Sequence, residues 1–257
     1  MFLFFVTSCS FFYENKDHTK KQKNNLNKEI INNFSKAISK NPNNFLFYLE
    51  RGKAKHAYGD YIGAIEDFND SLRLNPNSKA IFNRANSKYA YGDYMGAIKD
   101  YEKFISGKIY QDQVFYNIAN SQFILLNYKA AAENYTKYIE YDQDEANAYL
   151  NRGDAKFKIR DYLGSIKDYK KALDINKKSY IAFNNRGVSK FKLKKYRSAL
   201  EDFKKSLKLN SNNYNTFYNK SLTHLELKEF KKACIDLKKS IKLGKEIFKA
   251  EYLKICF

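Results

Sequence analysis

Residues 51–65 read RGKAKHAYGDYIGAI, and residues 152–166 repeat the same pattern as RGDAKFKIRDYLGSI. In both stretches an arginine precedes a small residue, and an Asp-Tyr pair precedes a second small residue and an isoleucine. Further copies follow along the chain, and the first small residue of each copy is Gly52, Ala85, Ala119, Gly153, Gly187 or Ser221. Their spacings are 33, 34, 34, 34 and 34, so an internal repeat decides the fold.

Each copy has the residue periodicity of two helices. In the copy around Gly153, Tyr149 and Phe157 lie four residues to either side, on the same face of a first helix. A second stripe follows at the spacing of Tyr162, Ile166 and Tyr169. The small residues allow the two helices to cross closely. One pair cannot bury both of its faces, so successive pairs are expected to stack.

The first copy, residues 45–78, carries most of a known family motif. It contains Tyr48, Gly52, Gly59-Asp60-Tyr61, Ala64, Phe68 and Pro76 at fixed offsets. This pattern resembles the tetratricopeptide repeat, although Arg51 and Lys55 stand where the family usually has Leu and Tyr. The resemblance implies an all-α solenoid of antiparallel helix pairs, a TPR superhelix with six repeats over residues 45–245.

The regions flanking the repeats complete the predicted organisation. Ile30, Phe34 and Ala37 have second-helix spacing, which predicts a helix over Asn27–Lys40 within an N-terminal half-repeat at residues 27–44. Residues 246–257 are expected to form a C-terminal capping helix. Residues 10–26 are polar and rich in Lys and Asn, as expected of a flexible tether.

Residues 1–9 have the character of an export signal. They form an apolar run that ends in Val6-Thr7-Ser8-Cys9, which resembles the bacterial lipoprotein box. The resemblance implies a lipid on Cys9 and a membrane-anchored lipoprotein that faces the extracytoplasmic side. The alternative is a frayed N-terminus on a cytoplasmic protein. Cys234 lies on a helix stripe that we expect to be buried, which predicts a packing role.

Charge leaves the class of partner open. The net charge is +19, but the basic residues are scattered along the chain instead of forming runs. Their distribution is uneven, because residues 186–257 hold 19 Lys and Arg against 7 Asp and Glu. We expect a protein or peptide partner. A nucleic-acid-binding α-solenoid and a self-assembling structural protein are the alternatives.

The sequence predicts no catalytic centre, metal site or cofactor. The three histidines, His18, His56 and His224, lie in separate segments without a paired carboxylate or cysteine. Arg51, Arg84, Arg152 and Arg186 each precede a lysine by four residues, and an aspartate follows on the next helix. This recurring set predicts an internal ladder of ion pairs rather than a ligand-binding stripe.

A row of asparagines is the candidate ligand site. Asn83, Asn117, Asn151, Asn185 and Asn219 recur at intervals of 34, on the first-helix face that lines the groove in the family. An amide offers a donor and an acceptor together, so such a row could pair with peptide backbone. Flanking aromatic residues complete the predicted site: Phe82, Tyr116 and Tyr218. The predicted function is a non-catalytic scaffold that binds an extended peptide in the concave groove.

Overall fold

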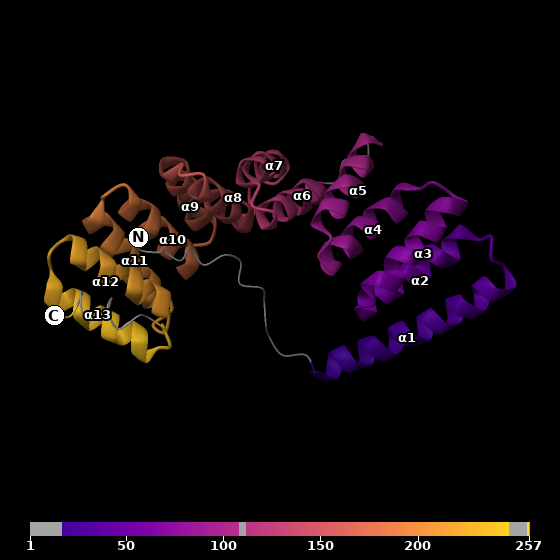
Figure 1. The fold of residues 1–257 in the computed structure, drawn as a ribbon, viewed down its shortest axis with the longest axis horizontal. Helices are drawn as coiled ribbons and strands as arrows, with labels where there is room; N and C mark the ends of the chain where they lie inside the picture. Colours follow the sequence, from indigo (N-terminus) through magenta and orange to yellow (C-terminus); the bar gives the residue numbers. More distant parts are fainter. Residues whose placement is uncertain (1–16, 108–111, 247–255, 257) are drawn as a thin grey trace. The chain divides into compact units, whose positions relative to one another are not determined.

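The structure, a computed structural model, describes residues 17–107, 112–246 and 256. Every regular element within these ranges is an α-helix, and two helices correspond to each repeat (Figure 1). The helices are α1 Asp17–Lys40, α2 Phe45–Tyr58, α3 Tyr61–Leu74, α4 Ser78–Tyr91, α5 Tyr94–Ser106, α6 Asp112–Ile124, α7 Tyr128–Tyr141, α8 Ala146–Lys158, α9 Tyr162–Ile175, α10 Tyr180–Lys192, α11 Tyr196–Leu209, α12 Tyr214–Glu226 and α13 Phe230–Lys242.

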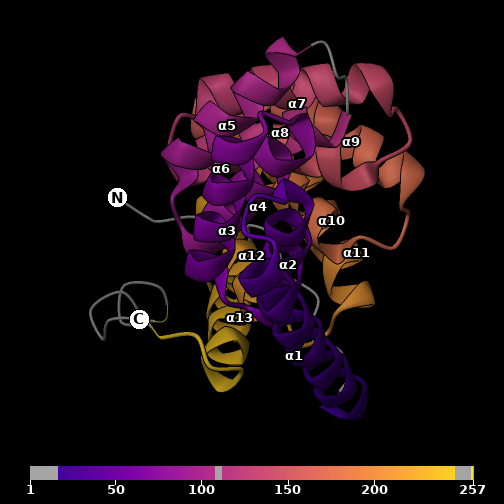
Figure 2. The same cartoon turned by 90° about the vertical axis from the view of Figure 1, so that its right-hand side faces the viewer.

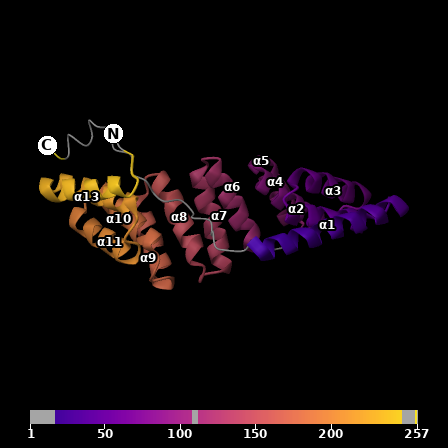
Figure 3. The same ribbon diagram turned by 90° about the horizontal axis from the view of Figure 1, so that it is seen from below.

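The helices form two compact units that meet in the sequence between Asn127 and Tyr128. In the first unit each helix from α1 to α6 packs against the next, and α1 lies along α2 (Figure 3). In the second unit the same holds from α7 to α13, and α12 runs beside α13 (Figure 2). This succession of packed helices is an all-α solenoid, as the repeat predicts.

Glycines allow the close crossing within several pairs. A Cβ atom on Gly153 would lie 2.7 Å from Tyr169 Cε1, and one on Gly52 would lie 2.7 Å from Phe68 Cε1. Both rings are fully buried. The aromatic residue of the second helix therefore fills the space that the small residue of the first helix leaves, which permits the close crossing that was predicted.

The turn inside each pair needs a left-handed residue. Gly59 and Gly92 adopt φ of 100° and 98° there, a conformation that costs glycine little. The equivalent residues of the later copies are Leu126, Arg160, Lys194 and Lys228, with φ between 57° and 65°. The turn geometry is thus retained in copies whose sequence lacks the Gly-Asp-Tyr signature.

The N-terminal helix is longer than predicted. Helix α1 begins at Asp17, so the expected start at Asn27 is wrong and the expected tether of residues 10–26 overlaps a helix. The segment from Asp17 to Lys40 contains no Gly or Pro to end a helix. Its later part packs on α2, with the rings of Phe34 and Phe47 6.1 Å apart. The expected signal at residues 1–9 lies outside the described residues, as does most of the expected capping helix.

Candidate functional site

Four repeats hold a buried aspartate between an arginine and a lysine of the preceding helix. In α8–α9, Arg152 Nε donates to Asp168 Oδ2 at 2.9 Å, and its second terminal nitrogen donates to Oδ1 at 2.7 Å. Lys156 Nζ lies 2.9 Å from Asp168 Oδ2. Equivalent sets are Arg51–Lys55–Asp67, Arg84–Lys88–Asp100 and Arg186–Lys190–Asp202. The predicted ion-pair ladder is confirmed, and it joins the two helices of each pair.

Two repeats depart from this arrangement. The third copy has uncharged side chains at the three positions: Ile118, Gln122 and Asn134. In the last copy Lys220 Nζ lies 2.8 Å from Asp236 Oδ1, and His224 replaces the second cation. His224 Nε2 is 3.5 Å from Asp236 Oδ2, while its Nδ1 is 2.6 Å from Glu229 Oε2. The hydrogen bond to His224 is the main reason that the pKa of Glu229 is lowered.

The asparagine row is partly exposed in the first unit. Asn83 on α4 and Asn117 on α6 are both half-buried. Asn83 Nδ2 donates to the Lys79 carbonyl at 2.8 Å, and Asn117 Nδ2 donates to the Tyr101 hydroxyl at 3.3 Å. These two amides stand at the same repeat position and keep part of their surface open to solvent.

In the second unit the same row is buried. Asn151 is 4% exposed, and Asn185 and Asn219 are 0% exposed. Asn185 Nδ2 donates to Asp154 Oδ1 at 2.9 Å, and Asn219 Nδ2 donates to Asn184 Oδ1 at 3.1 Å. Each of these bonds links one repeat to the preceding one. The expected open track of five amides is therefore not formed at these three positions.

Asp154 lies at the centre of the buried network. It is 2% exposed, and its Oδ1 also accepts a hydrogen bond of 2.7 Å from the Tyr169 hydroxyl. Burial raises the pKa of Asp154 to about 7, while the hydrogen bonds from Tyr169 and Asn185 oppose that rise. Burial and the nearby Asp154 also raise the pKa of Tyr169, which remains a donor. This carboxyl is shielded from solvent and serves the contact between repeats.

Asp154 and Asn184, which bond to the buried amides, lie outside the predicted row of asparagines. A usable signal was the Asn184-Asn185 pair, which places two amides on adjacent positions of one helix. Polar residues that recur at the repeat interval can bond to each other across repeats, because the same face of each helix meets its neighbour. The amides of such a row then bond to the neighbouring repeat and are buried in the contact between repeats.

The three predicted aromatic residues occupy different environments. Phe82 is half-buried and packs on Phe104, with ring centroids 5.3 Å apart. Tyr116 is also half-buried. Tyr218 is only 4% exposed and belongs to the core between α12 and α13. Phe82 and Tyr116 thus accompany the partly exposed amides of the first unit, whereas Tyr218 is a core residue.

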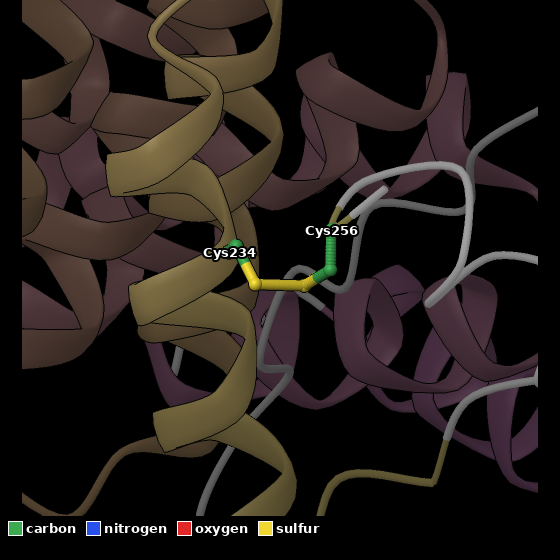
Figure 4. The surroundings of a disulfide bond; sticks show 2 residues. All are labelled: Cys234 and Cys256. Atoms are coloured by element: carbon green, nitrogen blue, oxygen red, sulfur yellow. A yellow bond between two sulfur atoms is a disulfide. The ribbon is translucent and has the colours of Figure 1, made fainter.

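Two cysteines pair in the second unit. Cys234 on α13 forms a disulfide with Cys256, and their Cα atoms are 4.9 Å apart (Figure 4). Cys234 is half-buried and covalently linked, so the expectation that it lies on a buried stripe in a packing role is wrong. The pairing was hidden in the sequence because Cys256 lies 22 residues further on, beyond the last repeat. Cys9 lies outside the described residues.

The described ranges hold neither a candidate metal cluster nor a candidate membrane-spanning helix. No group of three His, Cys, Asp or Glu residues there could hold a metal ion. None of the helices in the same ranges combines the length and the apolar character that crossing a bilayer requires.

Family models match the second half of the chain. Three tetratricopeptide-repeat models match residues 116–180, 180–213 and 214–244, which together make one uninterrupted stretch of about half the chain. No curated protein sequence matches this chain.

Solved structures with the same fold span much more of it. The C-terminal part of a TPR repeat-containing protein from Cytophaga hutchinsonii has a TM-score of 0.74 at 16% identity, covering 91% of this chain and 96% of that one. YrrB, described as a TPR protein with an unusual peptide-binding site, has a TM-score of 0.65 at 17% identity over 76% of this chain and 97% of its own. With the six helical repeats and the family matches, the chain belongs to the tetratricopeptide-repeat family.

Proposed function

We propose that this protein is a non-catalytic scaffold that binds an extended peptide segment of a partner protein. The repeat fold supports a role in protein interaction, since solenoids offer extended surfaces for that purpose. YrrB has a similar fold and is described as having a peptide-binding site, which is in keeping with the proposal. The observation that carries it is the pair of partly exposed amides, Asn83 and Asn117, at one repeat position of α4 and α6.

These two amides suit a peptide backbone better than a charged ligand. A carboxamide can donate to a peptide carbonyl and accept from a peptide N–H, whatever the sequence of the segment. Phe82 and Tyr116, which precede the amides, can add apolar contact at modest cost in side-chain entropy. The proposal therefore places the peptide on the first unit, with Asn83 and Asn117 as its anchors.

The experiment uses a peptide selected from a random library against the intact protein. Each lost hydrogen bond should cost about 1 kcal/mol, so the double variant Asn83→Ala/Asn117→Ala should weaken binding by about tenfold or more. The matched control, Asn185→Ala/Asn219→Ala, removes buried amides at the same register. It should lower the unfolding midpoint and leave peptide affinity within about twofold. Unchanged affinity in a folded Asn83→Ala/Asn117→Ala variant would refute this site.

We also propose that the protein is a lipoprotein anchored through Cys9 and facing the extracytoplasmic side. The motif Val6-Thr7-Ser8-Cys9 supports the anchor. The disulfide between Cys234 and Cys256 supports an oxidising compartment, where such bonds persist.

The test is fractionation of the full chain in a bacterial host. Wild type should partition into detergent, and Cys9→Ala should remain in the aqueous phase. Alkylation of unreduced protein should leave Cys234 and Cys256 unmodified. Equal partitioning of wild type and Cys9→Ala would exclude the lipid anchor, and full alkylation of both cysteines would exclude the oxidising compartment.

A further inference from the structure

The outward face of the second helices changes its charge along the chain. Five positions of each second helix, which follow its first residue by 1, 5, 8, 9 and 12 places, point away from the packed faces and are exposed or half-buried. In α3 these are Ile62, Glu66, Asn69, Asp70 and Arg73, where one cation against two acids gives −1. The same positions give +1 in α5, 0 in α7 and +2 in α9.

The face becomes strongly basic in the last two repeats. In α11 four cations against Glu201 give +3, and in α13 four lysines give +4 with no acid in the set. The α13 residues are Lys231, Ile235, Lys238, Lys239 and Lys242, all exposed. Asp236, the one acid within α13, is buried and paired with Lys220. This basic outer face, defined as those five positions in α11 and α13, holds eight cations against one acid, Glu201.

Large apolar side chains are exposed among these lysines. Ile235 is 67% exposed and lies three or four residues from Lys231, Lys238 and Lys239 on the helix surface. Phe230, at the start of α13, is 57% exposed. An exposed isoleucine between lysines has no favourable contact with water. It can instead be buried in an apolar layer that lies beneath anionic groups.

We propose that the basic outer face of α11 and α13 docks on an anionic lipid surface. Lysines attract anionic headgroups by about 1 kcal/mol each near a membrane, and Ile235 with Phe230 supplies apolar burial at the acyl boundary. A nucleic acid fits less well, because a face that binds nucleic acid favours arginine forks and stacking aromatics. Seven of the eight cations on this face are lysines, and none of its ten positions holds an aromatic residue.

The test is flotation of the full chain with lipid vesicles, in a Cys9→Ala background that separates the surface from any acyl anchor. Vesicles containing about a third phosphatidylglycerol should retain the protein, and pure phosphatidylcholine should not. Raising the salt about fivefold should weaken binding strongly. Lys238→Glu/Lys239→Glu should weaken it at least tenfold, and Ile235→Asn by a few-fold.

The matched control reverses two lysines on α5, where the same five positions carry a charge of only +1. Lys99→Glu/Lys103→Glu should change vesicle binding less than about threefold, since it lies outside the basic outer face. An equal loss in both charge-reversal variants would overturn the assignment, as would equal binding to neutral vesicles. Binding of random RNA in preference to anionic vesicles would also overturn it and would assign the face to nucleic acid. These outcomes are independent of the peptide site, because Asn83 and Asn117 remain unchanged.

Discussion

The helix pairs α8–α9 and α12–α13 share one fold but hold their buried aspartates differently. In α8–α9, Asp168 accepts two parallel hydrogen bonds from Arg152 and a third contact from Lys156. In α12–α13, Asp236 Oδ1 forms an ion pair with Lys220. The second carboxylate oxygen, Oδ2, makes no hydrogen bond within the described residues. A buried carboxylate without full compensation costs stability. The last repeat is therefore expected to be the weaker of the two pairs.

The small residue at the helix crossing also differs between these two pairs, and again the last repeat holds the less well satisfied polar group. Gly153 faces the ring of Tyr169, while Ser221 occupies its position in the last repeat and is fully buried. The Ser221 hydroxyl has no hydrogen-bond partner among the described residues. The helix pair is therefore specified by packing, and its polar contacts vary from copy to copy. Three substitutions test this, from the largest expected effect to the smallest.

Gly153→Leu should have the largest effect. A leucine side chain has no room beside Tyr169, and overpacking this crossing should lower the free energy of unfolding by about 4 kcal/mol. Chemical denaturation followed by circular dichroism measures the loss. In the last repeat, Ser221→Ala removes an unpaired buried hydroxyl and should be neutral or stabilising by about 1 kcal/mol. A Gly153→Leu protein as stable as wild type would show that the crossing is not close-packed.

Arg152→Ala should have the next largest effect. It leaves Asp168 buried with Lys156 alone, and losing one partner of a buried ion pair should cost about 3 kcal/mol. Arg152→Lys reproduces the single bond seen at Lys220 and should cost about 1 kcal/mol, since the fork geometry is lost and the charge remains. Arg73→Ala is the control, because its pair with Asp70 is exposed and should contribute less than about 0.5 kcal/mol. Equal losses for Arg152→Ala and Arg73→Ala would contradict the distinction.

The fold could be predicted well from the sequence because the same packing positions recur in every repeat. A small residue at the position of Gly153 recurs in all six copies, and an aromatic residue at the position of Tyr169 recurs in five, so a close helix crossing could be inferred from the sequence. The charged ladder was also predicted, since Arg152 and Asp168 recur in step and lie beside apolar stripes.

The candidate site was predicted less well. Asn117 and Asn185 stand at the same register, yet one is half-buried and the other fully buried. Their environments differ through non-repeating neighbours such as Asp154, which accepts a hydrogen bond from Asn185. Periodicity reports what the copies share, so it could not reveal which copies close over their amides. The disulfide between Cys234 and Cys256 could not be predicted for the same reason, because Cys256 belongs to no repeat.

Asp154→Asn should cause the smallest loss of stability of the three, and its effect should depend on pH. An aspartate in an unfolded chain ionises near pH 4, whereas burial raises the pKa of Asp154 to about 7 in the folded protein. Between these values the folded state binds the extra proton, so its free energy of unfolding falls as pH rises. Above about pH 7 both states are ionised, and the slope from this residue disappears.

Asparagine cannot ionise, but its oxygen can still accept the hydrogen bonds from Tyr169 and Asn185. The variant should match wild type near pH 4 and exceed its stability near pH 8, by up to about 4 kcal/mol for a difference of about three pKa units. The last repeat supplies the contrast, since Leu222 stands at the same register and is buried without charge.

Glu133→Gln, at an exposed carboxylate of α7, should leave the pH profile of wild type intact. Urea denaturation from pH 4 to pH 8 decides the matter: parallel profiles for wild type and Asp154→Asn would mean that Asp154 is already ionised in the folded protein. The network would then hold a buried negative charge, and Asn185 with Tyr169 would have to stabilise it fully.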